Sequence, residues 1–577
     1  MTTYLCPKCK KKNLCKNGHN GKGKQQWVCR SSGSDSGRNK TLCYSTLYPE
    51  RTYVVGHDGK RVKGEKPRKK FKRKIDTGRI MIFTAAQNAT PVHEGFFKTL
   101  KVFAEDWDAE LCVIPIRYKN PTSRWTASQQ NKEYWLRDIA EVELAEEGID
   151  VVSYLEEMEN GPLGDAPTWA QYLDEYARKY LYEQKRKLNS NLIVRADIKT
   201  QPTDGDPLTG MDGMTAGESG IFGHTKLRLK CIATPQDKMA KILTTTGACT
   251  VPNYTDSKAG KKGEHHHVLG ALVVQIKNDK VFHIHHILAR KPDGAFIFKD
   301  YEYHPSGKIK KAPPSKALIF GDAHYRFADK KVVSATFDKG GLADLLQAKV
   351  FVWHDLLDCY WGNPHNSKNP FITIAKHKSD YHLARSEVED TIAWMQKLGK
   401  GKTNYIIPSN HDDMFARWII REDWKEHPDN AEFYLETALQ MARSAKMSPT
   451  GAEYLDPFAY WVEQMTAGSK NIIALPRNKS LVIGDIELSF HGDKGPNGAR
   501  GTIDNLSKIG VKVISGHGHS AAIKDGHTRT GTMTRSTAEY TDGPGNWTNT
   551  HASIDAWDKR HLHFCIDGDF GFNYEEE

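Results

Sequence analysis

The stretch ALIFGDAHYRFAD, residues Ala317–Asp329, decides the fold of the C-terminal half of the chain. Its apolar start predicts a buried strand, which is followed directly by a carboxylate, Asp322, and an imidazole, His324. An aspartate after a strand is commonly a turn former or a helix N-cap. Aspartate and histidine are also metal ligands, so the rest of the chain must decide between the two readings.

Four more apolar segments in this half end in the same kinds of residue. KVFVWHDLLD leads to Asp355 and Asp358, NYIIPSNHDD to Asn410, His411 and Asp412, LVIGDIELSFHGD to His491, and VKVISGHGHS to His517 and His519. Because helical segments alternate with these strands, we predict an α/β domain whose strand ends converge on one site. Oxygen and imidazole ligands without cysteine suit Mn²⁺, Fe²⁺ or Zn²⁺. A carboxylate such as Asp355 can bridge two ions that activate water and hold a phosphate.

Together these motifs resemble the calcineurin-like metallophosphoesterase superfamily over about residues 315–577. The resemblance implies a β-sandwich flanked by helices, with a two-metal centre between strand ends. It implies one metal held by Asp322, His324 and His519, a second held by Asn410, His491 and His517, and Asp355 as the bridge. His411 would be the general acid or transition-state stabiliser, Asp412 would orient it, and Asp358 would support the ligands from behind.

Two positions depart from the family pattern. His354 stands where a glycine usually precedes the bridging aspartate, and Ser409 stands where a glycine usually precedes Asn410. Neither change removes a ligand. His354 could reach the substrate, although packing is the simpler interpretation.

The first 75 residues are strongly basic. They carry 21 Lys and Arg against 4 Asp and Glu, a net +17, and since the whole chain is +11 the remainder carries −6. A basic arm on an acidic body is typical of a polyanion-binding segment, and a solvated tail is the alternative. We expect sequence-independent, salt-dependent DNA contacts from the run KPRKKFKRK. The residues concerned are Arg68, Lys69, Lys70, Lys72, Arg73 and Lys74.

Five of the ten cysteines lie within the first 43 residues, and clustering of this kind favours metal over disulfides in a chain without a secretion signal. Cys6, Cys9, Cys29 and Cys43 could form a four-thiolate structural Zn²⁺ site, with Cys15 or His19 as alternatives to Cys43. The segment resembles the N-terminal zinc ribbons of some transposases and phage proteins, which bind DNA.

The predicted secondary structure changes twice in the middle of the chain. From Arg79 the pattern predicts a strand, a helix and a strand, followed by a helix over residues 169–187. Residues 191–312 contain short β-like runs, and six histidines between Glu264 and Ile287 either pack in a sheet or form a further metal site. The expected domains are a zinc ribbon (1–50), a basic linker (51–78), an α/β domain (79–190), a β-rich domain (191–312) and the catalytic domain (313–577).

The sequence of the middle region resembles the pre-early proteins of T-five-like siphophages. The similar segments include AAQNATPVHEGFF and TTTGACTVPNYTDSKAGKKGEHHH. That resemblance implies degradation of host DNA soon after infection.

The functional expectation is a DNase with two divalent ions, Mn²⁺ before Fe²⁺, Zn²⁺ or Mg²⁺. Alternatives are a phosphomonoesterase, a cyclic-nucleotide phosphodiesterase and a non-catalytic DNA-binding factor. No apolar stretch approaches the ~18 residues of a membrane span, so we expect a cytoplasmic protein with DNA as partner. A homo-oligomer and a phage or host protein partner are left open.

Overall fold

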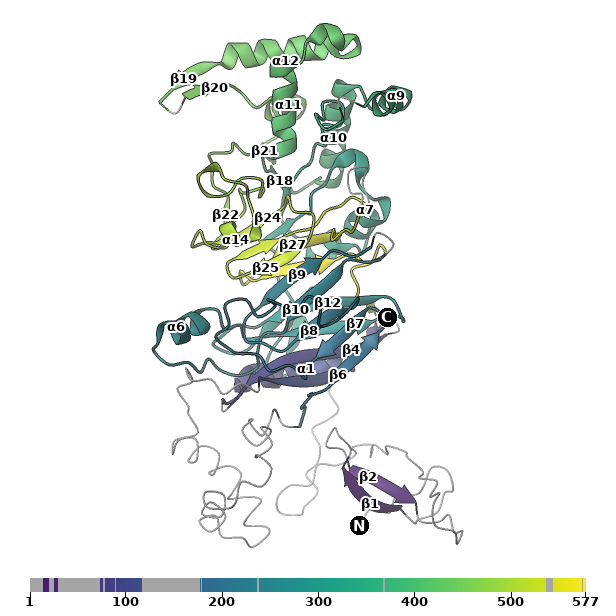
Figure 1. Ribbon diagram of the computed structural model, residues 1–577, viewed down its shortest axis with the longest axis vertical. Helices are drawn as coiled ribbons and strands as arrows, with labels where there is room; N and C mark the ends of the chain where they lie inside the picture. Colours follow the sequence, from purple (N-terminus) through teal and green to yellow (C-terminus); the bar gives the residue numbers. More distant parts are fainter. Residues whose placement is uncertain are drawn as a thin grey trace.

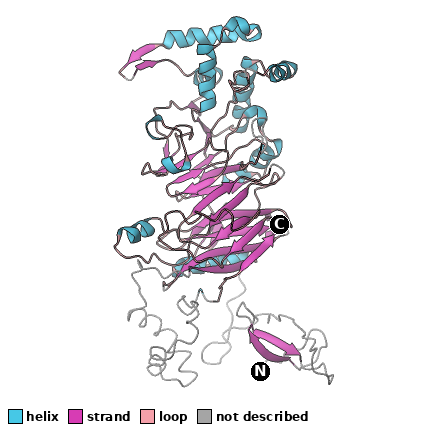
Figure 2. Cartoon of the chain, in the orientation of Figure 1, coloured by secondary structure: helices cyan, strands magenta, loops and turns pink. Residues whose placement is uncertain are grey.

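Three β-sheets that share one core organise the chain, and most of its helices gather at one end (Figure 2). This computed structural model describes residues 14–19, 25–29, 73–75, 78–116 except 89, 177, 179–572 except 236–237, 367–368, 450, 468 and 536–542, and 574–576. Within those residues the protein has a mixed α/β architecture.

The first sheet begins with the predicted strand–helix–strand unit, which is confirmed. β4 (Arg79–Gln87) and β5 (Glu110–Ile116) are parallel and joined by α1 (Glu94–Asp106). The helix begins after His93, whose Nδ1 accepts a hydrogen bond from the backbone of Phe96 at 3.1 Å. β11 (Gly270–Ile276) and β12 (Phe282–Leu288) complete the four-stranded sheet in the order β12-β11-β4-β5.

A ten-stranded sheet joins the middle of the chain to its C-terminal part. β6 (Lys185–Asn189), β7 (Leu192–Arg195), β8 (Ser219–Phe222), β9 (Arg228–Ile232) and β10 (Lys241–Thr245) form one half. β22 (Val482–Ile483), β23 (Ile486–Glu487), β24 (Lys512–Ser515), β25 (Ala522–Lys524) and β26 (His527–Arg529) form the other. The halves meet where Ile523 of β25 pairs with Leu229 of β9. The boundary expected at residues 312–313 therefore does not separate two sheets.

Two local predictions need correction. Lys185–Lys187, the end of the helix expected over residues 169–187, belongs to β6, while residues 169–176 and 178 lie outside the described residues. The segment LVIGDIELSF is a tight hairpin of β22 and β23 instead of one strand. Its turn contains Gly484 at φ 65°, and a glycine–aspartate pair favours such two-residue turns.

The third sheet contains the first three strands that were predicted to end in ligands. β16 (Ala317–Ile319), β17 (Val350–Trp353) and β18 (Thr403–Ile406) run parallel to one another and to β21 (Ile472–Ala474). β27 (Thr550–Ile554) and β28 (Arg560–Phe564) add an antiparallel edge, giving the order β21-β18-β17-β16-β27-β28. The carboxyl ends of β16, β17 and β18 therefore meet at one edge.

The core explains how the sheets stack. Ile319 and Val352 of the six-stranded sheet share a buried cluster with Ile514 of the ten-stranded sheet and Phe83 of the four-stranded sheet. A second cluster on the other face of the six-stranded sheet packs Trp353 against helices. These helices are α7 (Lys330–Phe337), α8 (Leu342–Leu346), α10 (Ala384–Leu398), α11 (Asn410–Arg421), α12 (Ala431–Ser444) and α13 (Pro457–Met465). Figure 1 shows α9 (Pro370–Lys378), α10, α11 and α12 gathered at one end of the molecule.

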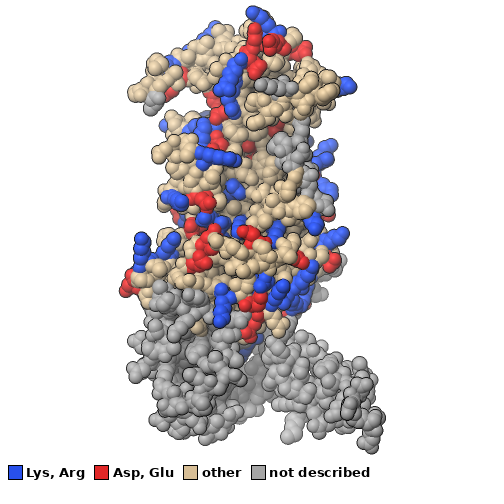
Figure 3. All heavy atoms as spheres, in the orientation of Figure 1, with Lys and Arg blue, Asp and Glu red and all other residues tan. Residues whose placement is uncertain are grey.

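The N-terminal predictions fall largely outside the described residues. β1 (Leu14–His19) and β2 (Gln25–Cys29) form an antiparallel hairpin, whereas Cys6, Cys9, Cys43 and residues 68–72 are not described. β3 (Arg73–Ile75) pairs with β29 (Tyr574–Glu576). Over the described part of the face in Figure 3, positive and negative side chains are interspersed. None of the helices in the described ranges is both long and apolar enough to cross a membrane.

Candidate metal centre

Two sheets contribute side chains to one buried cluster. Asp322 and His324 follow β16, Asp355 follows β17, and Asn410 begins α11 after β18, all from the six-stranded sheet. The ten-stranded sheet supplies three histidines from the loops after β23 and β24. These are His491, His517 and His519. The structure therefore brings together all seven residues that the sequence predicts as ligands.

The first group of ligand atoms contains Asp322, His324, Asp355 and His519, all buried and within 4.8 Å of one another. His519 Nε2 lies 3.1 Å from Asp322 Oδ2 and 3.1 Å from His324 Nε2. His324 Nε2 lies 3.7 Å from Asp355 Oδ2. These atoms face a common point and could hold a metal ion.

The second group shares Asp355 with the first. His491 Nε2 lies 3.1 Å from Asp355 Oδ2, and His517 completes the group within the same 4.8 Å limit. Asn410 lies between the two imidazoles, since its Oδ1 is 3.2 Å from His491 Nε2 and 3.0 Å from His517 Nδ1. An amide oxygen in that place is a suitable further ligand.

The backbone is strained at several of these positions. His324, Asp355, His517 and His519 have φ of 41°, 41°, 69° and 50°. Left-handed conformations cost non-glycine residues roughly 1–2 kcal/mol each and cluster at functional sites, where the surrounding fold enforces them. Four such residues in one cluster indicate that the fold places these side chains at a cost in backbone conformational energy.

Two features of these side chains fit a bound metal ion: the distances between the ligand atoms, and a buried carboxylate oxygen that has no hydrogen-bond donor in the described part of the chain. Ligand atoms bound to a first-row metal at about 2.1 Å lie roughly 3 Å apart, which matches the contacts of 3.1 Å at His519. Asp355 Oδ1 is buried and accepts no hydrogen bond from the described residues. An unpaired carboxylate oxygen inside a protein is costly, and a bound cation would satisfy it.

The pKa values of the cluster show the same demand for positive charge. Burial alone would lower the pKa of His324, but its bond to Asp358 and the charge of Asp355 raise the pKa to about 9. Burial is likewise outweighed at His491, whose pKa the charge of Asp355 raises to about 9. At Asp322 burial would raise the pKa, whereas the bond with His519 and the charge of His491 lower it to about 2. The carboxylates of the cluster thus stabilise positive charge on the groups around them.

Asp358, which the resemblance places behind the ligands, lies next to His324. Its Oδ1 lies 3.0 Å from His324 Nδ1, so the ring directs Nε2 at the cluster. A carboxylate behind a ligating histidine fixes the tautomer and raises the basicity of the ligand nitrogen.

His411 is held by a different partner from the one expected. Its Nδ1 donates to the backbone carbonyl of Asp358 at 2.6 Å, and its ring lies 4.7 Å from that of His324. Asp412, expected to orient His411, instead caps α11: its Oδ2 accepts from the backbone of Ser409 at 2.9 Å, and Ser409 Oγ accepts from its N–H. Burial, together with the charge of Asp456, raises the pKa of Asp412 well above its usual range.

His354 and Arg326 are both structural. The His354 ring is fully buried 5.6 Å from that of His491, and burial lowers its pKa to about 4, so it packs behind the cluster as a neutral ring. Arg326 Nε lies 3.1 Å from Glu387 Oε2 in a buried ion pair and stacks on Tyr381.

The sequence analysis missed several residues around the centre. Trp547 packs edge-on against His519 with ring centroids 4.2 Å apart. Arg477 donates to the carbonyl of Ser409 at 2.5 Å and lies 3.3 Å from Asp493, and so it connects α11 to the loop after His491.

Gly516 leaves room for Asp322, because a Cβ there would lie 2.2 Å from Asp322 Oδ1. Only Gly516 carried a sequence signal, as part of the GHGH motif.

A groove of about 680 Å³ opens beside the centre. Asn410 and His517 line it from the cluster side, and Arg417, Lys494 and Tyr454 line it further out. The side chains of Asn410 and His517 are therefore accessible from this side.

The histidines of the middle region do not form a metal-type group within the described ranges. His286 Nε2 lies 3.1 Å from the carbonyl of Thr245, and His267 Nε2 lies 2.9 Å from that of Thr250. His286 is thus a hydrogen-bonded sheet residue and His267 a hydrogen-bonded loop residue. A separate, more exposed group elsewhere consists of His377, His382 and Asp429.

Comparison with known proteins gives one informative similarity. Protein A1 of Escherichia phage T5 is 25% identical to this chain over 489 residues, which cover 83% of the chain and 80% of that protein. No protein-family model matches the chain.

Proposed function

We propose that the protein is a DNase that hydrolyses DNA phosphodiester bonds with two divalent metals, Mn²⁺ by preference. The observation that carries this proposal is that Asp355 belongs to two groups of candidate metal ligands. A carboxylate shared in this way is what a pair of adjacent ions requires. The match to the motif order of calcineurin-like metallophosphoesterases supports the same reading.

The ions would supply the nucleophile and neutralise the charge of the phosphate when bound. The chain itself positions them through Asp322, His324 and His519 on one side and Asn410, His491 and His517 on the other. His411 donates from Nδ1 to the carbonyl of Asp358, so Nε2 is the ring nitrogen that can pass a proton to the leaving oxygen.

One feature favours DNA over a small phosphate ester. The net charge of +17 in the first 75 residues would attract a polyanion and adds nothing to the binding of a small ester. The groove beside the centre adds no net charge to this argument, because Asp413 and Asp493 line it together with Arg417 and Lys494, and Lys494 lies 3.3 Å from Asp413. We further propose that residues 68–74 and a zinc ribbon at Cys6, Cys9, Cys29 and Cys43 provide this sequence-independent affinity.

The biological part of the proposal is destruction of host DNA in the cytoplasm of an infected bacterium. It is supported by the similarity to Protein A1 of Escherichia phage T5 and by the resemblance to siphophage pre-early proteins.

A substrate panel tests the proposal. The purified full-length protein is incubated with Mn²⁺ and, separately, with supercoiled plasmid, linear duplex, single-stranded DNA, p-nitrophenyl phosphate and bis(p-nitrophenyl) phosphate. We expect loss of DNA and slow turnover of the diester. Rapid monoester turnover without DNA loss would replace the proposal with a phosphomonoesterase, and DNA binding without cleavage would replace it with a binding factor.

A further inference from the structure

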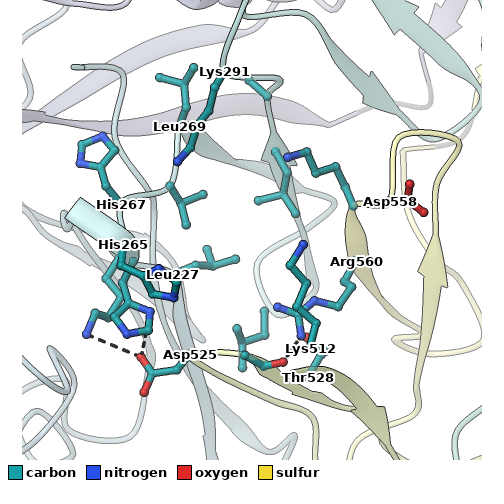
Figure 4. A pocket seen from close by; sticks show the side chains of 18 residues that line it. Leu227, His265, His267, Leu269, Lys291, Lys512, Asp525, Thr528, Asp558 and Arg560 are labelled. Atoms are coloured by element: carbon teal, nitrogen blue, oxygen red, sulfur yellow. Dashed lines mark hydrogen bonds and ion pairs between the residues drawn. The ribbon is translucent and has the colours of Figure 1, made fainter. Parts of the chain in front are cut away.

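A pocket of about 290 Å³ lies between the middle of the chain and the C-terminal strands (Figure 4). One side is formed by Leu227, Leu269 and the histidines at the end of α6 (Lys258–His265). The other side is formed by the starts of β24 and β28 and by the turn between β25 and β26. Its size is near the lower end for small-molecule sites, about 300 Å³, and suits a single nucleotide unit.

The charge of the lining is strongly uneven. Five cations, namely Lys226, Lys291, Lys512, Lys559 and Arg560, line the pocket together with two carboxylates, Asp525 and Asp558. Both carboxylates are engaged: Asp558 accepts two bonds from Lys316 at 2.6 and 2.7 Å, and Asp525 lies 3.6 Å from Lys226 and from His266. Lys512 is paired with Asp485, which lies outside the pocket lining, so the lysines that no described carboxylate neutralises are Lys291 and Lys559.

Lys291 and Lys559 form no ion pair with any residue that the structure describes. Lys559 is half-buried, and burial together with the charges of Lys512 and Lys291 lowers its pKa. Arg560 Nη1 donates to the backbone carbonyls of Val513 and Gly526, so its charge is not cancelled by a carboxylate. Clustered, partly desolvated cations of this kind are stabilised by an anion with several acceptor oxygens.

The apolar part of the lining lies on the opposite wall, beside the imidazoles of His265 and His267. Leu227, Leu269 and Ile523 line it, and Figure 4 shows Leu227 and Leu269 on the side of His265 and His267, across from Lys512 and Arg560. A ligand that matches both walls carries a phosphate at one end and a flat, weakly polar group at the other. Nucleotides have this composition, and a base can pack on apolar and imidazole surfaces.

The pocket is separate from the metal centre. β24 begins at Lys512 in the pocket, and His517 follows its other end, five residues or roughly 15 Å further along the chain. In the six-stranded sheet, Arg560 pairs with Ile554, which pairs with Ala317 at the start of β16. The pocket therefore lies at the amino ends of strands whose carboxyl ends carry the ligands.

We propose that this pocket is a second ligand site that binds one nucleotide unit, with its phosphate on Lys291 and Lys559 and its base on the apolar wall. The ligand is either a free nucleotide or the phosphorylated end of a DNA strand, which share this chemistry. The site stands independently of the proposed nuclease activity, because none of its residues belongs to the metal centre.

Calorimetric titration in EDTA tests the site, since EDTA keeps metals from recruiting phosphate to the other centre. The probes are inorganic phosphate, dAMP and a ten-residue oligonucleotide with and without a 5′-phosphate. The variants are Lys291→Glu, whose side chain is exposed and should not affect folding, and the double variant with Lys559→Glu. Lys425→Glu, an exposed lysine of η4 (Trp424–Glu426), is the matched control.

For the wild-type protein, we expect saturable binding of dAMP and weaker binding of inorganic phosphate. The affinity for dAMP should fall at least tenfold in Lys291→Glu and change less than twofold in Lys425→Glu. If the 5′-phosphorylated oligonucleotide binds more tightly than dAMP, and loses that advantage in Lys291→Glu, the ligand is a strand end; if dAMP binds more tightly, it is a free nucleotide. Absence of dAMP binding, or equal binding by wild type and Lys291→Glu, would overturn the assignment. Equal affinity for phosphate and dAMP would overturn the role of the apolar wall.

Discussion

Replacing Gly516 by alanine is expected to disable the metal centre without unfolding the protein. Gly516 joins β24 to His517, and an added Cβ would lie 2.2 Å from Asp322 Oδ1 and 3.0 Å from His354 Cβ. To restore ordinary contact distances, the Asp322 carboxylate must move by about 1 Å. Its bond from the backbone of His517, now 3.1 Å, would break in the process.

The size of the effect follows from that displacement. A misplacement of about 1 Å in a catalytic constellation costs on the order of 10²-fold in rate. Overpacking of a buried site costs roughly 1–3 kcal/mol of folding free energy, which is less than the 5–15 kcal/mol that domains typically have. We therefore expect about a hundredfold loss of DNA cleavage and reduced metal content in a protein that still melts cooperatively.

Three measurements check this prediction: Mn²⁺ content after dialysis by inductively coupled plasma mass spectrometry, the rate of plasmid cleavage, and a thermal melt. Gly217→Ala is the matched control, because a Cβ there meets nothing within 4 Å. If Gly516→Ala keeps full metal content and the wild-type cleavage rate, the reasoning that Gly516 makes room for a ligating Asp322 is refuted.

Three further predictions concern the same centre. The pKa values of His324 and His491 are raised to about 9, so these rings hold protons below that pH and must release them to bind metal. Mn²⁺ affinity should therefore rise from pH 6 to pH 9 and level off above it. Calorimetry in buffers of different ionisation enthalpy should show proton release, and a pH-independent affinity would contradict this prediction. Asp358→Asn should weaken Mn²⁺ binding by about 10–100-fold because His324 loses its carboxylate support, and an unchanged titration curve would be inconsistent with that role. His411→Ala should lower the cleavage rate by about 10²–10⁴-fold while two metals stay bound, whereas loss of metal would show that His411 is a ligand instead.

The ligands could be predicted from sequence because each one carries a local signal, a polar side chain directly after an apolar strand. Their pairing could not, since Asp322 and His517 lie 195 positions apart and follow strands of different sheets. The same limit applies to the ten-stranded sheet, in which no local pattern encodes that Ile523 pairs with Leu229.

Two incorrect predictions, for Asp412 and for the segment of β22 and β23, could have been avoided from local sequence patterns. Ser409 and Asp412 have the spacing of a capping box, which the structure forms, so Asp412 could have been assigned to the start of α11. The pair Gly484–Asp485 is a turn signal that divides β22 from β23. Trp547 carried no signal, because its contact with His519 depends on how the chain folds back after residue 543.

The central claim is that Asp355 joins two metals in a nuclease centre, and the cleavage rate of Asp355→Ala tests it most directly. The variant and the wild type are compared on plasmid DNA with Mn²⁺, with DNA binding measured in parallel by fluorescence anisotropy. We predict that cleavage is abolished, because the carboxylate shared by both ligand groups is gone, while DNA binding persists. Undiminished cleavage by Asp355→Ala would contradict the account.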